Sequence, residues 1–269
     1  MKVLVTGKYG QVARCLADCA ENYPALSLIF ASRSDADLNL DLEDEASLRL
    51  AVQTVKPDII INAAAYTQVD QAEDEPEKAM QINGIAPGIL AEEAKKYGAV
   101  FIQISTDYVF DGTLGHPYRP TDETNPTGAY GASKLKGEQA VRDATDEFVI
   151  IRTAWVYSSY GKNFYNTMLR YAEEKGKVSV VTDQIGNPTH ANDIARCVLG
   201  VCEQLRNGDR CLLGTVHHFA GPNEMTWFEF AQQIFADNNV TCIVEPIMTD
   251  QKLKKAKRPA NSRLVSTLK

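Results

Sequence analysis

Residues 3–13 read Val-Leu-Val-Thr-Gly-Lys-Tyr-Gly-Gln-Val-Ala, so an apolar, strand-like run passes through a glycine turn into a helix-like stretch. In dinucleotide-binding sheets this turn is tight, because its backbone must come close to a pyrophosphate at the N-terminus of the helix. Two glycines in the turn and the small Ala13 after it suit that geometry. A G-x-x-G pattern is common in turns, and its place between strand and helix favours a cofactor loop. We expect cofactor contacts from Gly7, Gly10, Gln11 and Val12.

The rest of the first half continues this alternation of apolar strands and amphipathic helices. Strands are predicted at 3–6, 26–31, 58–62, 100–105 and 148–152, and helices at 11–20, 45–55, 77–97 and 129–142. This order predicts an α/β fold with a Rossmann-type, doubly wound parallel sheet. After residue 152 the pattern loosens, with helices expected at 163–175, 192–205 and 226–238 and short strands near 178–181 and 216–219. We expect an NAD(P)-binding domain over 1–152 and a small, interleaved C-terminal substrate-binding lobe over 153–269, with the cleft between them.

Composition narrows the class of protein. The chain has 269 residues and a net charge of −7, and its apolar stretches are shorter than the roughly 20 residues needed to cross a bilayer. Acidic balance disfavours nucleic-acid binding, which needs a basic surface, and the cluster of Lys252, Lys254, Lys255, Lys257 and Arg258 is interpreted as solvated surface. The six cysteines form no C-x-x-C pair or zinc-ligand spacing. The composition therefore predicts a cytoplasmic protein that binds neither membrane nor nucleic acid.

Two further strand ends carry small or hydroxyl-bearing residues. Three alanines and a threonine follow Asn62, and they would let an adenosine and its ribose lie along the sheet edge: Ala63, Ala64, Ala65 and Thr67. Close packing of helix on sheet would also explain the alanines. Ser105-Thr106-Asp107-Tyr108 ends another strand at the edge where open parallel sheets bind ligands, so a hydroxyl there can bind a substrate carbonyl. A simple turn cap is the alternative.

Tyr130 and Lys134 lie four residues apart at the start of a predicted helix, so both side chains share one face. A free tyrosine has a pKa near 10 and a free lysine one near 10.4. A nearby ammonium and an oxidised nicotinamide would lower the tyrosine pKa towards working pH. The pair could then protonate the alkoxide formed when hydride reaches a ketone. An ordinary surface pair is the alternative.

The tip of the second strand reads Ala31-Ser32-Arg33-Ser34, with no acid to bind a ribose 2′-hydroxyl as NAD-specific sites do. Arg33 could form a forked pair with a 2′-phosphate, and Ser32 could add a hydrogen bond. An exposed loop arginine is the alternative. We therefore expect NADPH as the cofactor, with NADH tolerated.

Together these motifs resemble the extended short-chain dehydrogenase/reductases. The shared order is Gly7-x-x-Gly10, Asn62-Ala-Ala-Ala-Tyr-Thr, Ser105-Thr-Asp-Tyr-Val-Phe-Asp-Gly112 and Tyr130-Gly-x-Ser-Lys134. Within that superfamily, five further motifs are similar to the dTDP-4-dehydrorhamnose reductase family: Val69-Asp70-x-Ala72-Glu73, Arg152-Thr-Ala-Trp155-Val-Tyr157, Gly161-Lys-Asn-Phe164, Asp183-Gln-x-Gly186-x-Pro-Thr189 and Arg258-Pro-x-Asn-Ser-x-Leu264. The resemblance covers nearly the whole chain.

The resemblance implies reduction of the 4-keto group of dTDP-4-dehydro-6-deoxy-L-mannose (dTDP-4-dehydrorhamnose) to dTDP-L-rhamnose with NADPH, in nucleotide-sugar and cell-surface polysaccharide biosynthesis. It implies that the catalytic residues are Thr106, Tyr130 and Lys134. Substrate contacts are expected from Thr106, Asp107, Tyr108, Trp155 and Arg258. Further cofactor contacts are expected from Asp41, Leu42, Ser105, Tyr130 and Lys134.

Departures from related patterns bear on chemistry and assembly. Related nucleotide-sugar dehydratases have a second acid after the strand-end Thr-Asp pair, where this chain has Tyr108, so simple ketone reduction is favoured. A reductase of another 4-keto-6-deoxy nucleotide sugar and a non-catalytic regulatory binding subunit are the alternatives. Glutamates that bridge metal-linked dimers in the family would fall at Cys15 and Asn192, so we expect no metal and either a monomer or a metal-independent homodimer. The sequence ends at Lys269, where we expect relatives to continue with a further helix.

Overall fold

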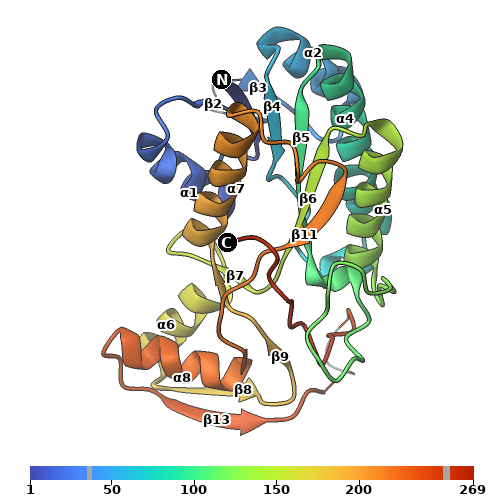
Figure 1. Ribbon diagram of the computed structural model, residues 1–269. Helices are drawn as coiled ribbons and strands as arrows, with labels where there is room; N and C mark the ends of the chain where they lie inside the picture. The colour runs from blue at the N-terminus through green and yellow to red at the C-terminus, as the bar shows by residue number, and fades with distance from the viewer. Residues whose placement is uncertain (35–37, 251–254) are drawn as a thin grey trace.

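The computed structural model describes residues 1–34, 38–250 and 255–269, and within them one parallel sheet organises the molecule (Figure 1). Its seven strands lie in the order β11-β6-β5-β4-β1-β2-β3. Their bounds are β1 Lys2–Thr6, β2 Ser27–Ser32, β3 Leu38–Asn39, β4 Ile59–Asn62, β5 Val100–Thr106, β6 Phe148–Thr153 and β11 Thr215–His218. The strand order reverses between β1 and β4, the place where doubly wound sheets open a crevice for ligands. The predicted Rossmann-type sheet is confirmed.

Helices cover both faces of the sheet, because successive strand residues point to opposite sides. On one face, strand residues such as Val5 and Ile61 pack on α1 (Gln11–Cys19) and α7 (Ala191–Arg206). On the other face, residues such as Leu4 and Ile60 pack on α2 (Glu45–Val55), α4 (Ala86–Tyr97) and α5 (Ala129–Ala144). The core therefore consists of two apolar layers, one on each side of the sheet.

The prediction of one continuous helix over 77–97 is wrong, because the structure divides this segment. The structure has α3 (Pro76–Met80), a π-helical turn (Gln81–Ile85) and then α4. Pro87 lacks a backbone N–H, so the regular hydrogen-bond ladder cannot run through it. The wide turn places the buried Asn83 side chain where it donates to the Tyr66 carbonyl (3.0 Å) and to Ser133 Oγ (3.1 Å). Asn83 thereby joins the loop after β4 to α5.

A second lobe forms below the sheet edge in Figure 1. It contains α6 (Phe164–Lys175), α8 (Trp227–Asp237) and the parallel pair β8 (Lys177–Val181) and β13 (Ile243–Ile247). Two short pairs link it to the sheet: β7 (Val156–Tyr157) with β10 (Thr189–His190), and β9 (Ile185–Gly186) with β12 (Met225–Thr226). β13 was not predicted, because its exposed residues and its proline mask the strand pattern.

The second half of the chain also returns to the main sheet. β11 pairs with β6 along the sheet edge, and α7 packs against α1. The chain builds the lobe before α7 and again after β11, so the two parts are interleaved in sequence. Within the described residues, no helix is long and apolar enough to cross a membrane. Lys252 and Lys254 of the predicted basic cluster lie outside the described residues.

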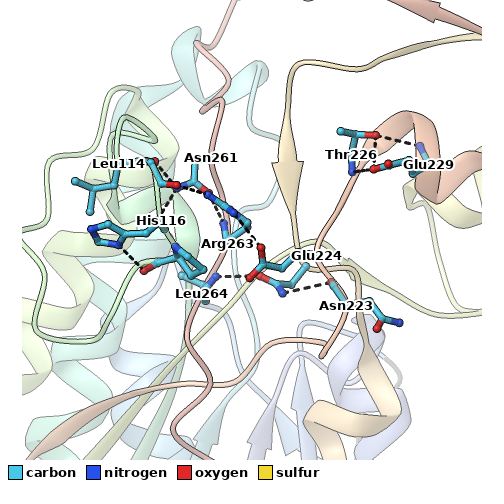
Figure 2. A network of polar contacts seen from close by, with 12 residues as sticks. Leu114, His116, Asn223, Glu224, Thr226, Glu229, Asn261, Arg263 and Leu264 are labelled. Carbon is cyan, nitrogen blue, oxygen red and sulfur yellow. Dashed lines mark hydrogen bonds and ion pairs between the residues drawn. The ribbon is translucent and has the colours of Figure 1, made fainter.

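The C-terminal segment ties the loop after β5 to the second lobe (Figure 2). Asn261 Nδ2 donates to the carbonyl oxygens of Leu114 (2.7 Å) and His116 (2.8 Å). Arg263 pairs with Glu224 at 2.9 Å, next to the start of α8. These contacts close the lobe over the carboxyl ends of the sheet strands, where the candidate site lies.

Candidate active site

A cavity of about 900 Å³ opens at the carboxyl ends of the central strands, between the sheet and the second lobe. The following predicted residues line it: Gly7, Gly10, Gln11, Val12, Ser32, Arg33, Ala63, Ala64, Ala65, Thr67, Ser105, Thr106, Asp107, Tyr108, Tyr130, Lys134 and Trp155. Asp41, Leu42 and Arg258 are not among the described residues that line it. The Asp41 N–H is bonded to Ser47 Oγ at 3.0 Å in the turn before α2. Cofactor contact by Asp41 and Leu42 stays a prediction.

The glycine turn after β1 leaves no room for a side chain. Gly7 has φ +80°, and a Cβ there would lie 2.9 Å from Cα and Cβ of Ala64. The Gly10 N–H donates to the Gly7 carbonyl at 2.8 Å, which closes the turn. Among the described side chains, none caps the N-terminus of α1, whose first N–H groups face the cavity end of the helix. The turn and helix start thus provide a cradle suited to a pyrophosphate.

A buried polar chain that the sequence analysis missed supports this cradle from below. The Thr6 hydroxyl donates to Asn62 Oδ1 at 2.6 Å, and Asn62 Nδ2 donates to Gln103 Oε1 at 2.9 Å. The Ala64 N–H in turn donates to the Thr6 hydroxyl at 3.1 Å. The chain crosses β1, β4 and β5 and holds the alanine loop against the glycine turn. Three polar residues inside apolar strands were its signal in the sequence.

Tyr130 and Lys134 project from the start of α5 towards the end of β5. Tyr130 is 9% exposed, and its side chain forms a hydrogen bond with Thr106. Lys134 is 4% exposed and donates from Nζ to the Ile104 carbonyl at 2.7 Å. The structure therefore brings all three predicted catalytic residues together.

The electrostatics of the tyrosine differ from the expectation. Burial raises the pKa of Tyr130 above its ordinary value, the charges of Asp107 and Tyr108 raise it further, and only the hydrogen bond with Thr106 lowers it. Burial lowers the pKa of Lys134 to about 8, and the nearby Glu138 carboxylate opposes that shift. Among the chain's own groups, Tyr130 is thus held as a protonated phenol. That form can donate a proton.

Ser105 and Thr106 occupy different positions although they are adjacent. Successive strand residues point to opposite sides, and the Ser105 hydroxyl donates to the buried Glu138 carboxylate at 2.6 Å. Thr106 contacts Tyr130 and donates to Asp107 Oδ1 at 3.0 Å. Burial raises the pKa of Asp107 to about 6, against hydrogen bonds from Ser262 and Thr106 that lower it. Of the two hydroxyls, that of Thr106 is the one that lies against Tyr130.

Aromatic rings from the second lobe form one wall of the cavity. Trp155 stacks on Trp227 with ring centroids 3.5 Å apart and planes 7° apart, and Phe164 packs on Trp227 at 4.5 Å. Trp155 has φ +46°, a backbone conformation that is costly for a bulky residue. A Cβ at Gly186 would lie 2.4 Å from the Trp155 ring, so only glycine leaves it room. Trp155 was predicted from the sequence, and Trp227 was not.

The tip of β2 carries the residues expected at a ribose phosphate. The Ser32 hydroxyl donates to the Ser34 carbonyl at 2.7 Å, so it stabilises the turn. Arg33 lies 3.6 Å from the Glu43 carboxylate, and its side chain is 69% exposed. A pair this exposed is weak and screened by salt, so the guanidinium can exchange partners.

Arg258 acts on the cavity through another residue. Its Nη2 lies 2.7 Å from Asp70 Oδ2, in the Val69–Glu73 motif, and its side chain forms a hydrogen bond with Tyr108, a cavity residue. Burial raises the pKa of Tyr108 to about 12, and the Arg258 charge opposes that shift. Glu73, from the same motif, accepts from the Ala129 N–H at 2.8 Å and so caps α5. The motif therefore positions both sides of the reaction centre.

The two positions expected at a dimer metal site lie on the helices that pack together, α1 and α7. Cys15 is 1% exposed, and burial raises its pKa to about 11. The Asn192 N–H donates to His190 Nδ1 at 3.1 Å at the start of α7. The described residues contain no group of three or more His, Cys, Asp or Glu side chains that could hold a metal ion.

Comparison with known proteins gives consistent matches over almost the whole chain. Residues 1–268 match the family model described as RmlD substrate binding domain. A dTDP-4-dehydrorhamnose reductase of Sinorhizobium fredii is 39% identical over 98% of this chain and 88% of its own length. A dTDP-4-dehydrorhamnose reductase structure from Clostridium acetobutylicum superposes with a TM-score of 0.91 at 35% identity, covering 99% of this chain and 90% of the other. One from Bacillus anthracis, in complex with NADP, gives 0.88 at 35% identity, with the same coverage.

Proposed function

Because the chain belongs to the dTDP-4-dehydrorhamnose reductase family, we propose that it reduces the 4-keto group of dTDP-4-dehydro-6-deoxy-L-mannose to dTDP-L-rhamnose with NADPH. One observation carries the proposal: Tyr130, Lys134 and Thr106 meet at the mouth of a dinucleotide cradle, against an aromatic wall. A non-catalytic binding protein would need only the cradle and would have no use for a buried proton donor. The product belongs to nucleotide-sugar and cell-surface polysaccharide biosynthesis.

Three side chains handle the ketone oxygen. NADPH, when bound, supplies the hydride that the C4 carbon accepts. Thr106 and Tyr130, which are hydrogen-bonded to each other, present two hydroxyls to the C4 oxygen. As negative charge develops on that oxygen, Tyr130 donates its phenolic proton and the alcohol forms. Lys134 is held on the Ile104 carbonyl and lines the cavity, where its ammonium would hold the nicotinamide ribose.

The residues of the cradle fit a dinucleotide. The start of α1 suits the pyrophosphate, because its first N–H groups have no side-chain cap and Gly10, Gln11 and Val12 line the cavity. Small residues at the end of β4, Ala63 to Ala65 and Thr67, leave space beside it for the adenosine. Arg33 is exposed enough to leave Glu43 for a ribose 2′-phosphate, which supports NADPH over NADH. NADH would lose only this contact, so it is tolerated.

The substrate side is formed by the second lobe and the loop after β5. The Trp155–Trp227 stack offers an apolar face to the sugar ring. Tyr108 packs edge-on against Tyr130 at 5.4 Å and connects the reaction centre to Arg258. Tyr108 stands where a dehydratase would need a second acid, so Asp107 has no partner for the elimination of water. The arrangement supports reduction alone.

Location and assembly are inferred from the cysteines and from the residues at the two expected metal positions. All six cysteines are free thiols, and four of them are buried in helices, which suits the reducing cytoplasm. We place the protein in the cytoplasm as a monomer or a homodimer held without metal. Its small-molecule partner is the dTDP-linked sugar.

The test is NADPH oxidation with dTDP-4-dehydrorhamnose, followed by identification of the sugar by NMR. We expect absorbance at 340 nm to fall only when this keto sugar is present, with dTDP-L-rhamnose as product. A product with the opposite configuration at C4 would identify a reductase of another 4-keto-6-deoxy sugar. Absence of turnover with any keto-sugar nucleotide, despite NADPH binding, would identify a binding subunit.

A further inference from the structure

A buried ion pair lies directly behind the reaction centre, outside the cavity lining. Glu138 on α5 is 0% exposed, and Arg152 on β6 is 2% exposed. The Arg152 guanidinium donates two hydrogen bonds to the Glu138 carboxylate, from Nε to Oε1 at 2.9 Å and from Nη2 to Oε2 at 2.7 Å. Ser105 on β5 donates its hydroxyl to Glu138 Oε1 at 2.6 Å. Glu138 therefore joins three elements: α5, β5 and β6.

This contact is the third of three between α5 and the end of β5. Tyr130, Lys134 and Glu138 follow one another at intervals of four residues, so they form a row along one helix face. Their partners are three consecutive residues of β5. Tyr130 bonds the Thr106 side chain, Lys134 bonds the Ile104 carbonyl, and Glu138 accepts from Ser105.

Stability alone does not explain such a pair. Desolvating two charges costs as much as their attraction returns, and apolar residues of similar size often serve a core equally well. Glu93 on α4 provides a comparison within the same protein. It is also 0% exposed, but its partners Arg49 and Lys96 are 26% and 58% exposed and lie at the surface. Glu138 has one surface partner, Arg142, which is 40% exposed and lies 3.5 Å from Oε2, but the cation that holds it with two short hydrogen bonds, Arg152, is itself buried beneath the site.

We propose that Glu138 is a positioning residue: clamped by Arg152 and Ser105, its carboxylate fixes α5 on β5 and keeps Lys134 charged. The inference rests on the proposed function, because it assigns Glu138 a role in that reduction. The row of contacts sets where Tyr130 and Thr106 meet. The carboxylate lies one helical turn beyond Lys134, so its negative charge favours the ammonium.

Other charged groups near the reaction centre act less directly on Lys134. Tyr130 on the same helix and Asp107 and Tyr108 after β5 face the phenol side, and Arg152 on β6 lies behind the carboxylate. The pKa of Lys134 is lowered to about 8 by burial, and Glu138 is the one charge that raises it. Loss of the carboxylate should therefore bring deprotonation of Lys134 into the neutral range.

The experiment compares Glu138→Gln with Glu93→Gln, which also removes a fully buried carboxylate but lies away from the cavity. The pH dependence of kcat/KM is measured for both. For the wild type, activity should fall as pH rises through the pKa of Lys134. In Glu138→Gln this alkaline limb should move down by roughly one pH unit, the lower range for one nearby opposite charge. Glu93→Gln should lower the urea midpoint and leave the limb in place.

Ser105→Ala tests the positioning part, because it removes one contact and keeps every charge. Its kcat should fall about two- to tenfold, the effect of one hydrogen bond, with the alkaline limb unmoved. If Glu138→Gln yields no folded protein, Glu138→Gln/Arg152→Met, which removes both charges together, replaces it with the same expectation. An unmoved limb in the folded variant, or an equal shift in Glu93→Gln, would overturn the proposal.

Binding of NADPH, followed by nicotinamide fluorescence against pH, separates this proposal from the proposed function. Lys134 lines the cofactor cavity, so NADPH binding should weaken when Lys134 loses its charge. As pH rises, this weakening should begin at a lower pH in Glu138→Gln than in the wild type. If the wild type binds NADPH but does not turn over the keto sugar, the proposed function fails while the binding curves still decide the role of Glu138. Coincident binding curves for the two proteins would refute that role.

Discussion

Replacing Tyr130 with phenylalanine removes one oxygen from a ring that is 9% exposed and packed edge-on against Tyr108 at 5.4 Å. The ring contacts are kept, and the lost hydrogen bond to Thr106 is worth about 1 kcal/mol in stability. The loss in catalysis should be larger. Without a positioned acid, kcat should fall by about 10²–10⁴. At 1.36 kcal/mol per tenfold, that corresponds to roughly 3–5 kcal/mol of transition-state stabilisation.

The two magnitudes make the assay decisive. Steady-state NADPH oxidation should show a collapse of kcat with little change in KM for NADPH, because the phenol acts only in the transition state. Lys134→Met serves as the comparison. It removes a positive charge and a side chain that lines the cofactor cavity, so kcat and NADPH binding should weaken together. If Tyr130→Phe kept more than about a tenth of wild-type kcat, against the expected loss, another acid would be at work. Tyr108 would be tested first.

Three further outcomes are expected. Arg33→Ala should raise KM for NADPH about tenfold and leave KM for NADH nearly unchanged. Tenfold is the lower range for a charged hydrogen bond, which we expect because Arg33 is 69% exposed. Equal effects on both cofactors would refute the 2′-phosphate assignment. EDTA should change neither turnover nor the mass measured by light scattering, since Cys15 and Asn192 stand where we expect a metal-bridged dimer to need carboxylates. A dimer that dissociates would contradict this. The pKa of Asp107 is raised to about 6 from an ordinary value near 3.9, so its contribution to stability declines as pH rises from about 4 to 6. At pH 7, Asp107→Asn should therefore have a higher free energy of unfolding than the wild type, by up to about 3 kcal/mol, and a higher urea midpoint. A lower urea midpoint would show that the folded protein stabilises the carboxylate.

The fold could be predicted closely where local signals determine each element. Helix α2 was expected over 45–55 and is observed there, because Asp44 caps its N-terminus and Lys56 ends it in the left-handed conformation. The parallel order followed from strand–helix alternation, which needs no knowledge of distant contacts. The break before α4 was missed because apolar residues keep helical spacing through Pro87, and spacing does not register a missing N–H.

In the candidate site, too, the residues with a local sequence signal could be predicted. Glycine turns, strand ends and the Tyr130–Lys134 pair could be read from the sequence, since a parallel sheet brings every strand's carboxyl end to one edge. Glu138 had a local signal that was not used: a carboxylate one turn beyond Lys134 on the face that meets the sheet, and an arginine within the apolar strand Phe148–Thr153. Two opposite charges at buried positions predict an ion pair, because a buried charge without a partner is strongly destabilising.

Trp227 had no such signal. It lies at the first position of α8, inside the Thr226–Glu229 capping box, where an apolar residue is expected only to pack in the lobe. Its place in the cavity depends on Trp155, whose backbone at φ +46° turns the ring towards it, and on Gly186, which leaves that ring room. A strained tryptophan persists only where its surroundings determine it, and such strain is concentrated at functional sites. The three residues come from separate parts of the chain, so the aromatic wall exists only once the lobe has closed over the sheet.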